Sequence, residues 1–276
     1  MALIVDYHMH LRTPNGDVEE IDHSVEAVER YVEEAARAGV DEIGFTEHVY
    51  YFRETRALWE TRYQLDRCRF GVEAYAEAVL GGKRRGLPVK LALEVDFVPG
   101  RVEELRSALE PYPWDYLLGS VHWIGGLAVD SRPGLWETLP VEEVWRLYFD
   151  TLCEAAASGF CHALAHPDLA KIYGLRPDAG VVAELHERAA DAFAAAGVAV
   201  EVSTAGLRKP VGELYPDLSL LVACAERGVP VTLASDAHLP SDVGRDLERA
   251  VAHARSAGYE TVTVFDAGEA RQEPLG

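Results

Sequence analysis

The sequence predicts an α/β fold in which parallel strands and helices alternate and close into a barrel. Short apolar segments alternate with longer amphipathic segments along the 276 residues, which is the pattern of repeated βαβ units. About eight such units fit a closed barrel better than an open sheet, although a doubly wound sheet stays the alternative. Histidines and carboxylates follow the apolar segments, where the strand ends of a barrel converge.

The first half of the chain divides into elements by its hydrophobic period. Helices are expected where apolar residues recur every three to four positions, and Gly39 and the pair Gly81-Gly82 are expected to end two of them. In chain order we predict a strand over 3–7, a helix over 24–38, a strand over 41–46, a helix over 63–80, a strand over 89–95, a helix over 102–109 and a strand over 116–121.

The second half continues the same alternation, with Gly197 and Gly228 as expected helix ends. No low-complexity linker or internal repeat interrupts it, so we expect one barrel domain over 1–276. The predicted elements are a helix over 141–157, a strand over 162–165, a helix over 178–196, a strand over 198–203, a helix over 218–227, a strand over 231–235, a helix over 244–257 and a strand over 261–265.

Composition excludes several classes of partner. The net charge is −20, from 46 acidic and 26 basic residues, and such a surface repels long nucleic acids and anionic membranes. No apolar run approaches the roughly 20 residues of a membrane span, and the first residues do not resemble a signal peptide. The four cysteines show no C-x-x-C spacing, so we expect reduced thiols in a cytoplasmic protein.

Potential metal ligands recur at the predicted strand ends. His8 and His10 lie two residues apart on an extended segment, so both imidazoles project to one side and can bind one ion. The other candidates at strand ends are His48, Glu94, His122, His166, Asp236 and His238. Six of the ten histidines therefore lie where a barrel places its active site. His162, His186 and His253 are expected to be structural, and His23 is a weaker candidate ligand.

These ligands are more numerous than one ion requires. A zinc ion takes about four ligands, and a catalytic site keeps one position for water. We therefore expect two or three divalent ions with a bridging carboxylate. The mixture of imidazole and carboxylate favours zinc, iron or manganese over magnesium or calcium. Clustered cations of this kind suit the hydrolysis of phosphate esters.

The ordered motifs resemble those of the polymerase and histidinol phosphatase (PHP) superfamily. They are His8-x-His10, Thr46-Glu47-His48, Glu94, Ser120-Val121-His122-Trp123, His166-Pro167-Asp168 and Ser235-Asp236-Ala237-His238. The chain is most similar to the histidinol-phosphate phosphatase branch, through the segments over 119–122, 165–171 and 201–208. The resemblance implies a distorted (β/α)7, TIM-like barrel with a trinuclear metal site at the C-terminal ends of the strands.

The resemblance also implies a role for each ligand. His8, His10, Glu94 and Asp236 would hold the first ion, and Glu94 would bridge to a second ion held by His122 and His166. His48 and His238 would hold the third ion, with Asp17 as the expected extra ligand and His23 as the alternative. Arg208 matches the position of a phosphate-binding residue, and Lys171 is a second candidate. Asp168 is expected either to cap the following turn or to orient a ligand imidazole.

The function implied is hydrolysis of a small phosphate monoester, with L-histidinol phosphate favoured and Arg208, Asp236 and His238 as the catalytic residues. The alternative is a PHP-type phosphoesterase that acts on small nucleotides or a phosphodiester. A barrel amidohydrolase would carry a lysine ligand on a middle strand, and no lysine lies near His122. A non-catalytic interaction module would have lost ligands. The sequence does not determine the oligomeric state.

Overall fold

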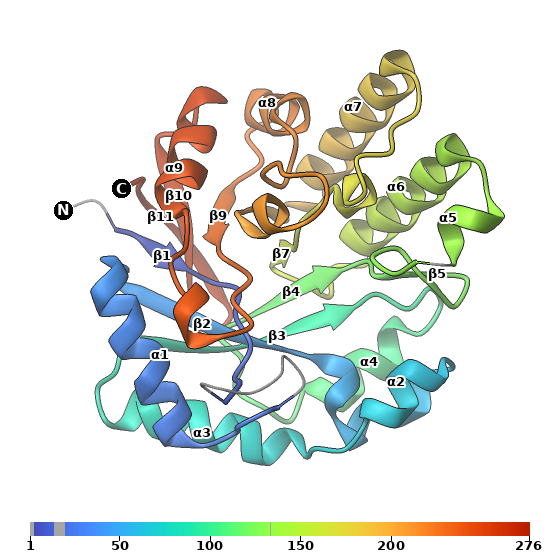
Figure 1. Ribbon diagram of the computed structural model, residues 1–276. Coiled ribbons are helices and arrows are strands. Elements are labelled where there is room, and N and C mark those ends of the chain that lie inside the picture. Colours follow the sequence, from blue (N-terminus) through green and yellow to red (C-terminus); the bar gives the residue numbers. More distant parts are fainter. Residues whose placement is uncertain (1–2, 14–19, 133) are drawn as a thin grey trace.

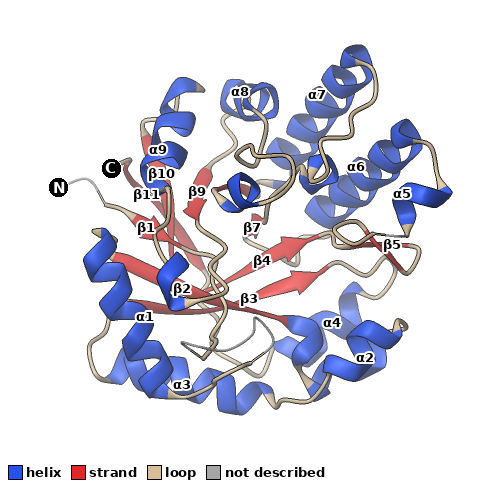
Figure 2. Cartoon of the chain, viewed as in Figure 1, coloured by secondary structure: helices blue, strands red, loops and turns tan. Residues whose placement is uncertain are grey.

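The computed structural model describes residues 3–13, 20–132 and 134–276, and its central feature is a sheet of seven parallel strands (Figure 1). Each strand pairs with the next one along the chain, and helices surround the sheet on the outside (Figure 2). In spatial order the strands are β1 Val5–Asp6, β2 Glu42–His48, β3 Val89–Asp96, β4 Tyr116–Ser120, β7 Ala163–Leu164, β8 Ala199–Ser203 and β9 Val231–Ala234.

The last strand returns to the first, so the sheet is a nearly closed barrel. The backbone N–H of Tyr7 donates to the carbonyl of Leu233 over 3.0 Å, and that of His10 donates to Ala237 over 2.9 Å. The predicted seven-stranded, TIM-like barrel is thereby confirmed, and the open doubly wound alternative is wrong.

The predicted strand over 261–265 is not an eighth strand of the barrel. It forms β10 (Thr261–Asp266), which pairs antiparallel with β11 (Glu269–Pro274) in a separate hairpin. The reason is the turn at Ala267 and Gly268, both with positive φ, which reverses the chain where a parallel strand needs a long crossover. A second hairpin that was not predicted joins β5 (Trp123–Ile124) to β6 (Leu127–Ala128).

The helices cover the barrel, and several of their ends follow the predicted chemistry. The Ser24 hydroxyl accepts a hydrogen bond from the N–H of Ala27, and Gly39 ends the same helix in the left-handed conformation. The helices are α1 Val25–Ala38, α2 Arg62–Arg67, α3 Val72–Arg84, α4 Val102–Leu109, α5 Leu135–Thr138, α6 Val141–Ala157, α7 Ala179–Ala196, α8 Leu218–Glu226 and α9 Leu247–Ser256. Among the described residues, no helix combines the length and apolar character needed to cross a membrane.

The prediction of one helix over 63–80 is wrong. The segment is divided into α2 and α3, because the N–H groups of Arg69 and Phe70 both donate to the carbonyl of Tyr51 and hold an extended connection. Gly82 does not end α3. A Cβ atom on Gly82 would lie 2.8 Å from a methyl group of Val28, so this glycine lets α3 pack closely against α1.

Aromatic side chains fill the N-terminal end of the barrel. The ring of Tyr116 lies 5.3 Å from that of Tyr7 and 4.8 Å from that of Phe265, and all three side chains are fully buried. The hydroxyl of Tyr116 donates to the carbonyl of Tyr7 over 2.7 Å. The aromatic rings therefore occupy the end of the barrel that lies opposite the predicted ligands.

Gly44 of β2 makes room for this aromatic packing, which leads to a stability prediction. A Cβ atom at Gly44 would lie 1.8 Å from the hydroxyl oxygen of Tyr116. We expect Gly44→Ala to lower the free energy of unfolding by about 1–3 kcal/mol, measured by urea denaturation. Gly180→Ala in α7 is the control, because no heavy atom lies within 4 Å of its Cβ position. An equal loss in both variants would contradict this account.

Candidate metal centre

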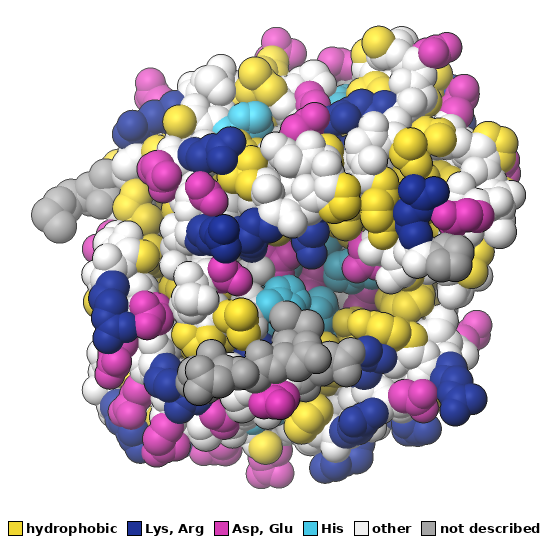
Figure 3. All heavy atoms as spheres, viewed as in Figure 1, with side chains coloured by type: hydrophobic (Ala, Val, Ile, Leu, Met, Phe, Trp, Pro, Cys, Tyr) yellow, Lys and Arg dark blue, Asp and Glu magenta, His cyan; other side chains and the backbone are white. Residues whose placement is uncertain are grey.

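The barrel brings the predicted ligands together at the C-terminal ends of its strands. Six imidazoles and two carboxylates form four overlapping groups, and the ligand atoms within each group lie within 4.8 Å of one another. The groups are His8, Glu94 and His166; His8, His10 and Asp236; His48, Glu94 and His122; and His10, His48 and His238. Figure 3 shows histidine side chains at the bottom of a hollow on this face. We call these eight residues the ligand cluster.

Glu94 lies at the centre of the ligand cluster. Its carboxylate is fully buried, and its two oxygens face different imidazoles. Oε1 lies 3.0 Å from Nε2 of His166 and 3.3 Å from Nε2 of His122. Oε2 lies 2.7 Å from Nδ1 of His48 and 3.3 Å from Nε2 of His8. A carboxylate with one oxygen toward each of two ligand groups has the arrangement of a bridging ligand.

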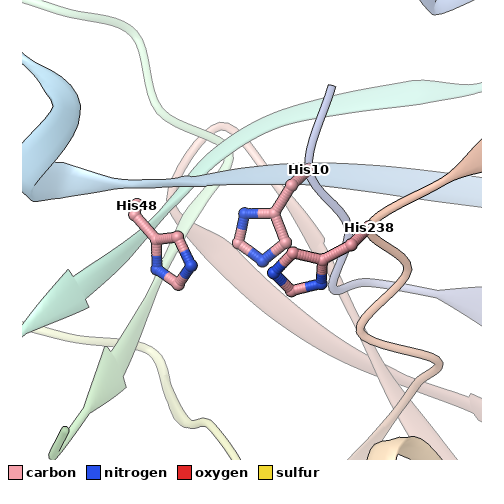
Figure 4. Close-up of side chains that lie close together, drawn as sticks. All are labelled: His10, His48 and His238. Atoms are coloured by element: carbon pink, nitrogen blue, oxygen red, sulfur yellow. The ribbon is translucent and has the colours of Figure 1, made fainter. Parts of the chain in front are cut away.

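Three imidazoles from distant parts of the chain converge on one side of the ligand cluster (Figure 4). His10 follows β1, His48 ends β2, and His238 follows β9. The ring of His10 lies 4.3 Å from that of His48 and 4.2 Å from that of His238, measured between centroids. Three nitrogen ligands at this separation could bind a single cation.

Several atoms of the ligand cluster are buried without hydrogen-bond partners among the described residues. They include Nε2 of His8 and Nε2 of His10. Buried polar atoms without partners are costly, at about 1–3 kcal/mol each. A cation between these two nitrogens and Asp236 would satisfy both, and imidazole with carboxylate is a donor set that divalent transition metals prefer. The residues present therefore fit a divalent metal site.

An outer set of buried carboxylates orients the imidazoles. Glu201 Oε2 lies 2.8 Å from Nδ1 of His8, and Asp96 Oδ1 lies 2.8 Å from Nδ1 of His122. Glu47 Oε1 lies 3.2 Å from Nδ1 of His10. A carboxylate on Nδ1 fixes the ring and leaves Nε2 for a metal ion.

The sequence analysis assigned no role to these three carboxylates. Each lies in or at the end of an apolar strand segment, where a charged residue needs a partner. That position was the signal in the sequence that could have indicated them.

The alternative ligand His23 contacts this outer set and not the ligand cluster. Its Nε2 lies 3.5 Å from Oε2 of Glu47, and its ring packs against Phe52 and Tyr75. Arg12 also holds Glu47, through hydrogen bonds of 2.7 and 3.2 Å to the two carboxylate oxygens. In the part of the chain that the structure describes, His23 belongs to none of the four ligand groups. Asp17 lies outside the described residues.

The buried carboxylates of the ligand cluster need positive charge nearby to offset their own. Burial raises the pKa of the Glu94 carboxyl, but the imidazoles of His48, His8 and His122 hold it well below its usual range. Burial lowers the pKa of His122, yet Glu94 and Asp96 raise it to about 10. Burial instead lowers the pKa of His48 and holds that of His238 well below its usual range. Protons on imidazoles such as His122 therefore offset part of the carboxylate charge when no cation is bound. A divalent ion would replace these protons, since metal binding and protonation compete for the same nitrogens.

Arg208 contacts the loop that carries two of the ligands. It ends the short helix η4 (Ala205–Arg208), and its guanidinium donates to the backbone carbonyls of Ser235 and Asp236. The contact places a guanidinium next to Asp236 of the ligand cluster. The sequence placed Arg208 on a late strand-end loop, and the structure adds its contact with the neighbouring strand end.

Lys171 has different surroundings. Its side chain is buried, and Nζ lies 2.8 Å from Oδ2 of Asp168 and donates to the carbonyl of Leu214 over 2.7 Å. Oδ2 of Asp168 also accepts a hydrogen bond of 2.6 Å from the N–H of Asp217. Asp168 therefore neither caps the following turn nor contacts a ligand imidazole, and both expectations for it are wrong. A substrate contact of Lys171 stays a prediction.

Two residues of the ligand cluster have strained backbones. His166 has φ 28° and Asp236 has φ 52°, and they are two of the four described non-glycine residues with positive φ. Such strain persists where surrounding contacts hold it, and it clusters at functional sites. The N–H of His166 donates to Oε1 of Glu201 over 3.2 Å, and Arg208 holds the carbonyl of Asp236.

A cavity of about 150 Å³ lies beside the ligand cluster. Its lining includes three residues of the cluster, His48, His122 and His238, together with aromatic and acidic side chains. A small molecule in this cavity would contact the groups that are positioned to hold metal ions.

The sequence and the fold are similar to those of known proteins. Residues 8–205 match the model of the PHP domain. The "Probable histidinol-phosphatase" of Deinococcus radiodurans is 36% identical over 267 residues, which cover 95% of this chain and 97% of the relative. The histidinol-phosphatase of Bacillus subtilis is 26% identical over 266 residues, with 87% of this chain and 95% of the relative covered.

A crystal structure has the same fold. It is that of histidinol phosphate phosphatase from Lactococcus lactis, complexed with zinc, L-histidinol and phosphate. The TM-score is 0.79 at 20% identity, and the alignment covers 98% of this chain and all of that chain. The domain match spans more than half of the sequence, and the Deinococcus relative is similar over nearly its whole length. The chain therefore belongs to the PHP domain family.

Proposed function

We propose that this protein is a metal-dependent phosphatase that hydrolyses L-histidinol phosphate to L-histidinol and phosphate, a step of histidine biosynthesis. The observation that carries the proposal is the buried ligand cluster around Glu94, in which a carboxylate faces imidazoles on two sides. The relatives from Deinococcus and Bacillus bear the name histidinol-phosphatase. The Lactococcus structure of the same fold holds zinc and the two products of this reaction.

The proposed metal centre contains two or three divalent ions, zinc, iron or manganese. His8, His10, Glu94 and Asp236 would hold the first ion. Glu94 would share the second with His122 and His166, and His48 and His238 would hold the third. The proximity of His10 to His48 and His238 supports a third position, since those three imidazoles form a ligand group of their own. Asp17 is proposed as an additional ligand of the third ion.

Divalent ions bound at such a cluster supply a nucleophile from water at neutral pH and neutralise charge on the phosphoryl oxygens. The side chains of the protein hold the candidate metal ligands in place. Glu201, Glu47 and Asp96 keep the imidazoles of His8, His10 and His122 in one orientation, so that no reorganisation is needed during the reaction.

Arg208 is proposed to bind the phosphate of the substrate. It is a basic residue in contact with the Asp236 loop, and a guanidinium offers five N–H donors. The donors that do not contact the carbonyls of Ser235 and Asp236 would stabilise the charge that develops on the phosphoryl group.

The substrate assignment is tested by phosphate release from a panel of esters. We expect the specificity constant kcat/KM for L-histidinol phosphate to exceed those for mononucleotides and for a phosphodiester by roughly 100-fold or more, because one cavity must fit the whole leaving group. Metal content is measured on the same sample. A nucleotide or diester as the best substrate would overturn the assignment and leave the metal centre intact.

Glu94 is the residue on which metal binding should depend most. Glu94→Gln removes the charge that faces both ligand groups, and we expect loss of bound metal as measured by mass spectrometry of the purified protein. Glu201→Gln is the graded comparison, because Glu201 orients His8 and holds the backbone of His166 but belongs to none of the four ligand groups; metal affinity should fall roughly 10–100-fold. Full metal content in Glu94→Gln would contradict the ligand assignment.

Arg208→Ala tests the phosphate contact. We expect kcat for L-histidinol phosphate to fall by about 100–1,000-fold, the usual effect of removing a group that stabilises charge in the transition state. Arg208→Lys should recover part of the loss, since it restores charge without the planar guanidinium. Metal content is compared in both variants, because Arg208 also holds the backbone of Asp236. Unchanged turnover in Arg208→Ala would show that the arginine has no such role.

A further inference from the structure

The cavity beside the ligand cluster has a continuous aromatic wall. The ring of Tyr50 stacks on the imidazole of His48 at 4.9 Å between centroids. Tyr63 lies 6.0 Å from Tyr50, and Trp123 lies 5.5 Å from Tyr63. All four residues line the cavity. The wall therefore begins at a proposed metal ligand, His48, and extends away from it through Tyr50 and Tyr63 to Trp123.

The outer end of this wall is accessible. The side chain of Tyr63 is 44% exposed, and it is one of three large hydrophobic side chains with this degree of exposure in the part of the chain that the structure describes. Arg67 lies over its ring, 3.6 Å from the centroid, and supports the ring from one side. An exposed aromatic residue that is held in place at the edge of a polar cavity is typical of a binding surface.

The size of the cavity limits what it can hold. A volume of about 150 Å³ accommodates a ligand of about the size of one small ring, as cavities of this volume bind benzene. An imidazole fits this volume. A nucleoside, which consists of a base and a sugar, would have to extend past the accessible edge of the cavity at Tyr63. The volume thus favours a small ring on a short linker.

Asp130 and Ser131 line the cavity together with the aromatic wall. No lysine or arginine among the described residues forms an ion pair with the exposed Asp130 carboxylate. The loop itself is fixed to the barrel, because the N–H of Val129 donates to the carbonyl of His122 over 2.8 Å. Tyr173 also donates from its hydroxyl to the carbonyl of Asp130 over 2.6 Å. A carboxylate on a loop whose backbone is held in place, at a cavity with aromatic walls, is suited to a cationic ligand.

We infer that Asp130 binds the protonated amine of the substrate while Tyr50, Tyr63 and Trp123 hold its imidazole, so that this cavity selects small amino-alkyl phosphate esters with one ring. The inference rests on the proposed function, because the ligand cluster must receive the phosphate for the rest of the ester to reach the aromatic wall. Asp130 is thus a specificity-determining residue and takes no part in the breaking of the P–O bond.

The test compares two substrates that differ only in the amine. Steady-state kinetics are measured with L-histidinol phosphate and with 3-(imidazol-4-yl)propyl phosphate, which lacks the amino group and the charge it carries. We expect Asp130→Asn to lower kcat/KM for L-histidinol phosphate by about 10–100-fold, mainly through KM, because the amide keeps a hydrogen-bond acceptor but loses the negative charge that attracts the ammonium group. The loss with the analogue should stay below about threefold.

Glu226→Gln is the matched control for charge. It removes one exposed carboxylate at the last residue of α8, and the chain enters β9 from there, at the opposite end of the barrel. It should leave the kinetics with both substrates unchanged. Tyr63→Ala and Tyr63→Phe test the wall: the alanine variant should raise KM for both substrates, and the phenylalanine variant should behave as the wild type, because the ring alone is required.

The outcomes separate this inference from the proposed function. If the wild type hydrolyses neither substrate, the proposed function fails. Suppose instead that the wild type hydrolyses L-histidinol phosphate while Asp130→Asn lowers kcat/KM equally for both substrates, or for neither of them. In that case the role of Asp130 is overturned and the proposed function stands. An unchanged KM in Tyr63→Ala would overturn the role of the aromatic wall.

Discussion

A single buried carboxylate, Glu94, constrains the architecture of this protein. A charge in the interior of a barrel is tolerated only if surrounding groups compensate for it. Here both oxygens of Glu94 face imidazoles at 2.7–3.3 Å, and the pKa of the carboxyl remains well below its usual range despite complete burial. The strand ends around it supply those imidazoles, so the requirement of one charge accounts for the position of the ligand cluster.

The rigidity of the ligand cluster comes from residues that do not belong to it. Glu201, Glu47 and Asp96 each take the Nδ1 side of an imidazole, and Arg12 in turn holds Glu47. These carboxylates are on strands of the barrel, whose backbones are fixed by their neighbours. An orienting group on a strand positions a ligand better than the same group on a loop.

The two ends of the barrel have opposite characters. Tyr7, Tyr116 and Phe265 pack at the N-terminal end with stacked and tilted rings, and all three side chains are fully buried. At the C-terminal end the backbone itself is strained at His166 and Asp236, and Arg208 is one of the contacts that hold it. The stability of the aromatic end thus supports a functional end that contains unpaired polar atoms.

The contacts of two basic residues near strand ends could not be predicted from the sequence. Arg208 and Lys171 both follow barrel strands in motifs that resemble one family. The structure places Arg208 against the Asp236 loop and Lys171 in a buried pair with Asp168. Nothing in the local sequence distinguishes them, because the partner of each depends on how neighbouring crossovers pack.

Local patterns were sufficient to predict most elements and the residues that gather in the ligand cluster. The helical period located α4 and α6 at their observed bounds, turn chemistry located the ends of α1, and the order of histidines at strand ends indicated the cluster. The resemblance to one family supplied the count of seven strands. The tertiary structure decided the break between α2 and α3, the separate β10–β11 hairpin and the carboxylate that orients each imidazole. These features depend on contacts between residues far apart in the chain, such as that between His8 and Glu201, which are 193 positions apart. A local hydrophobic period contains no information about such contacts.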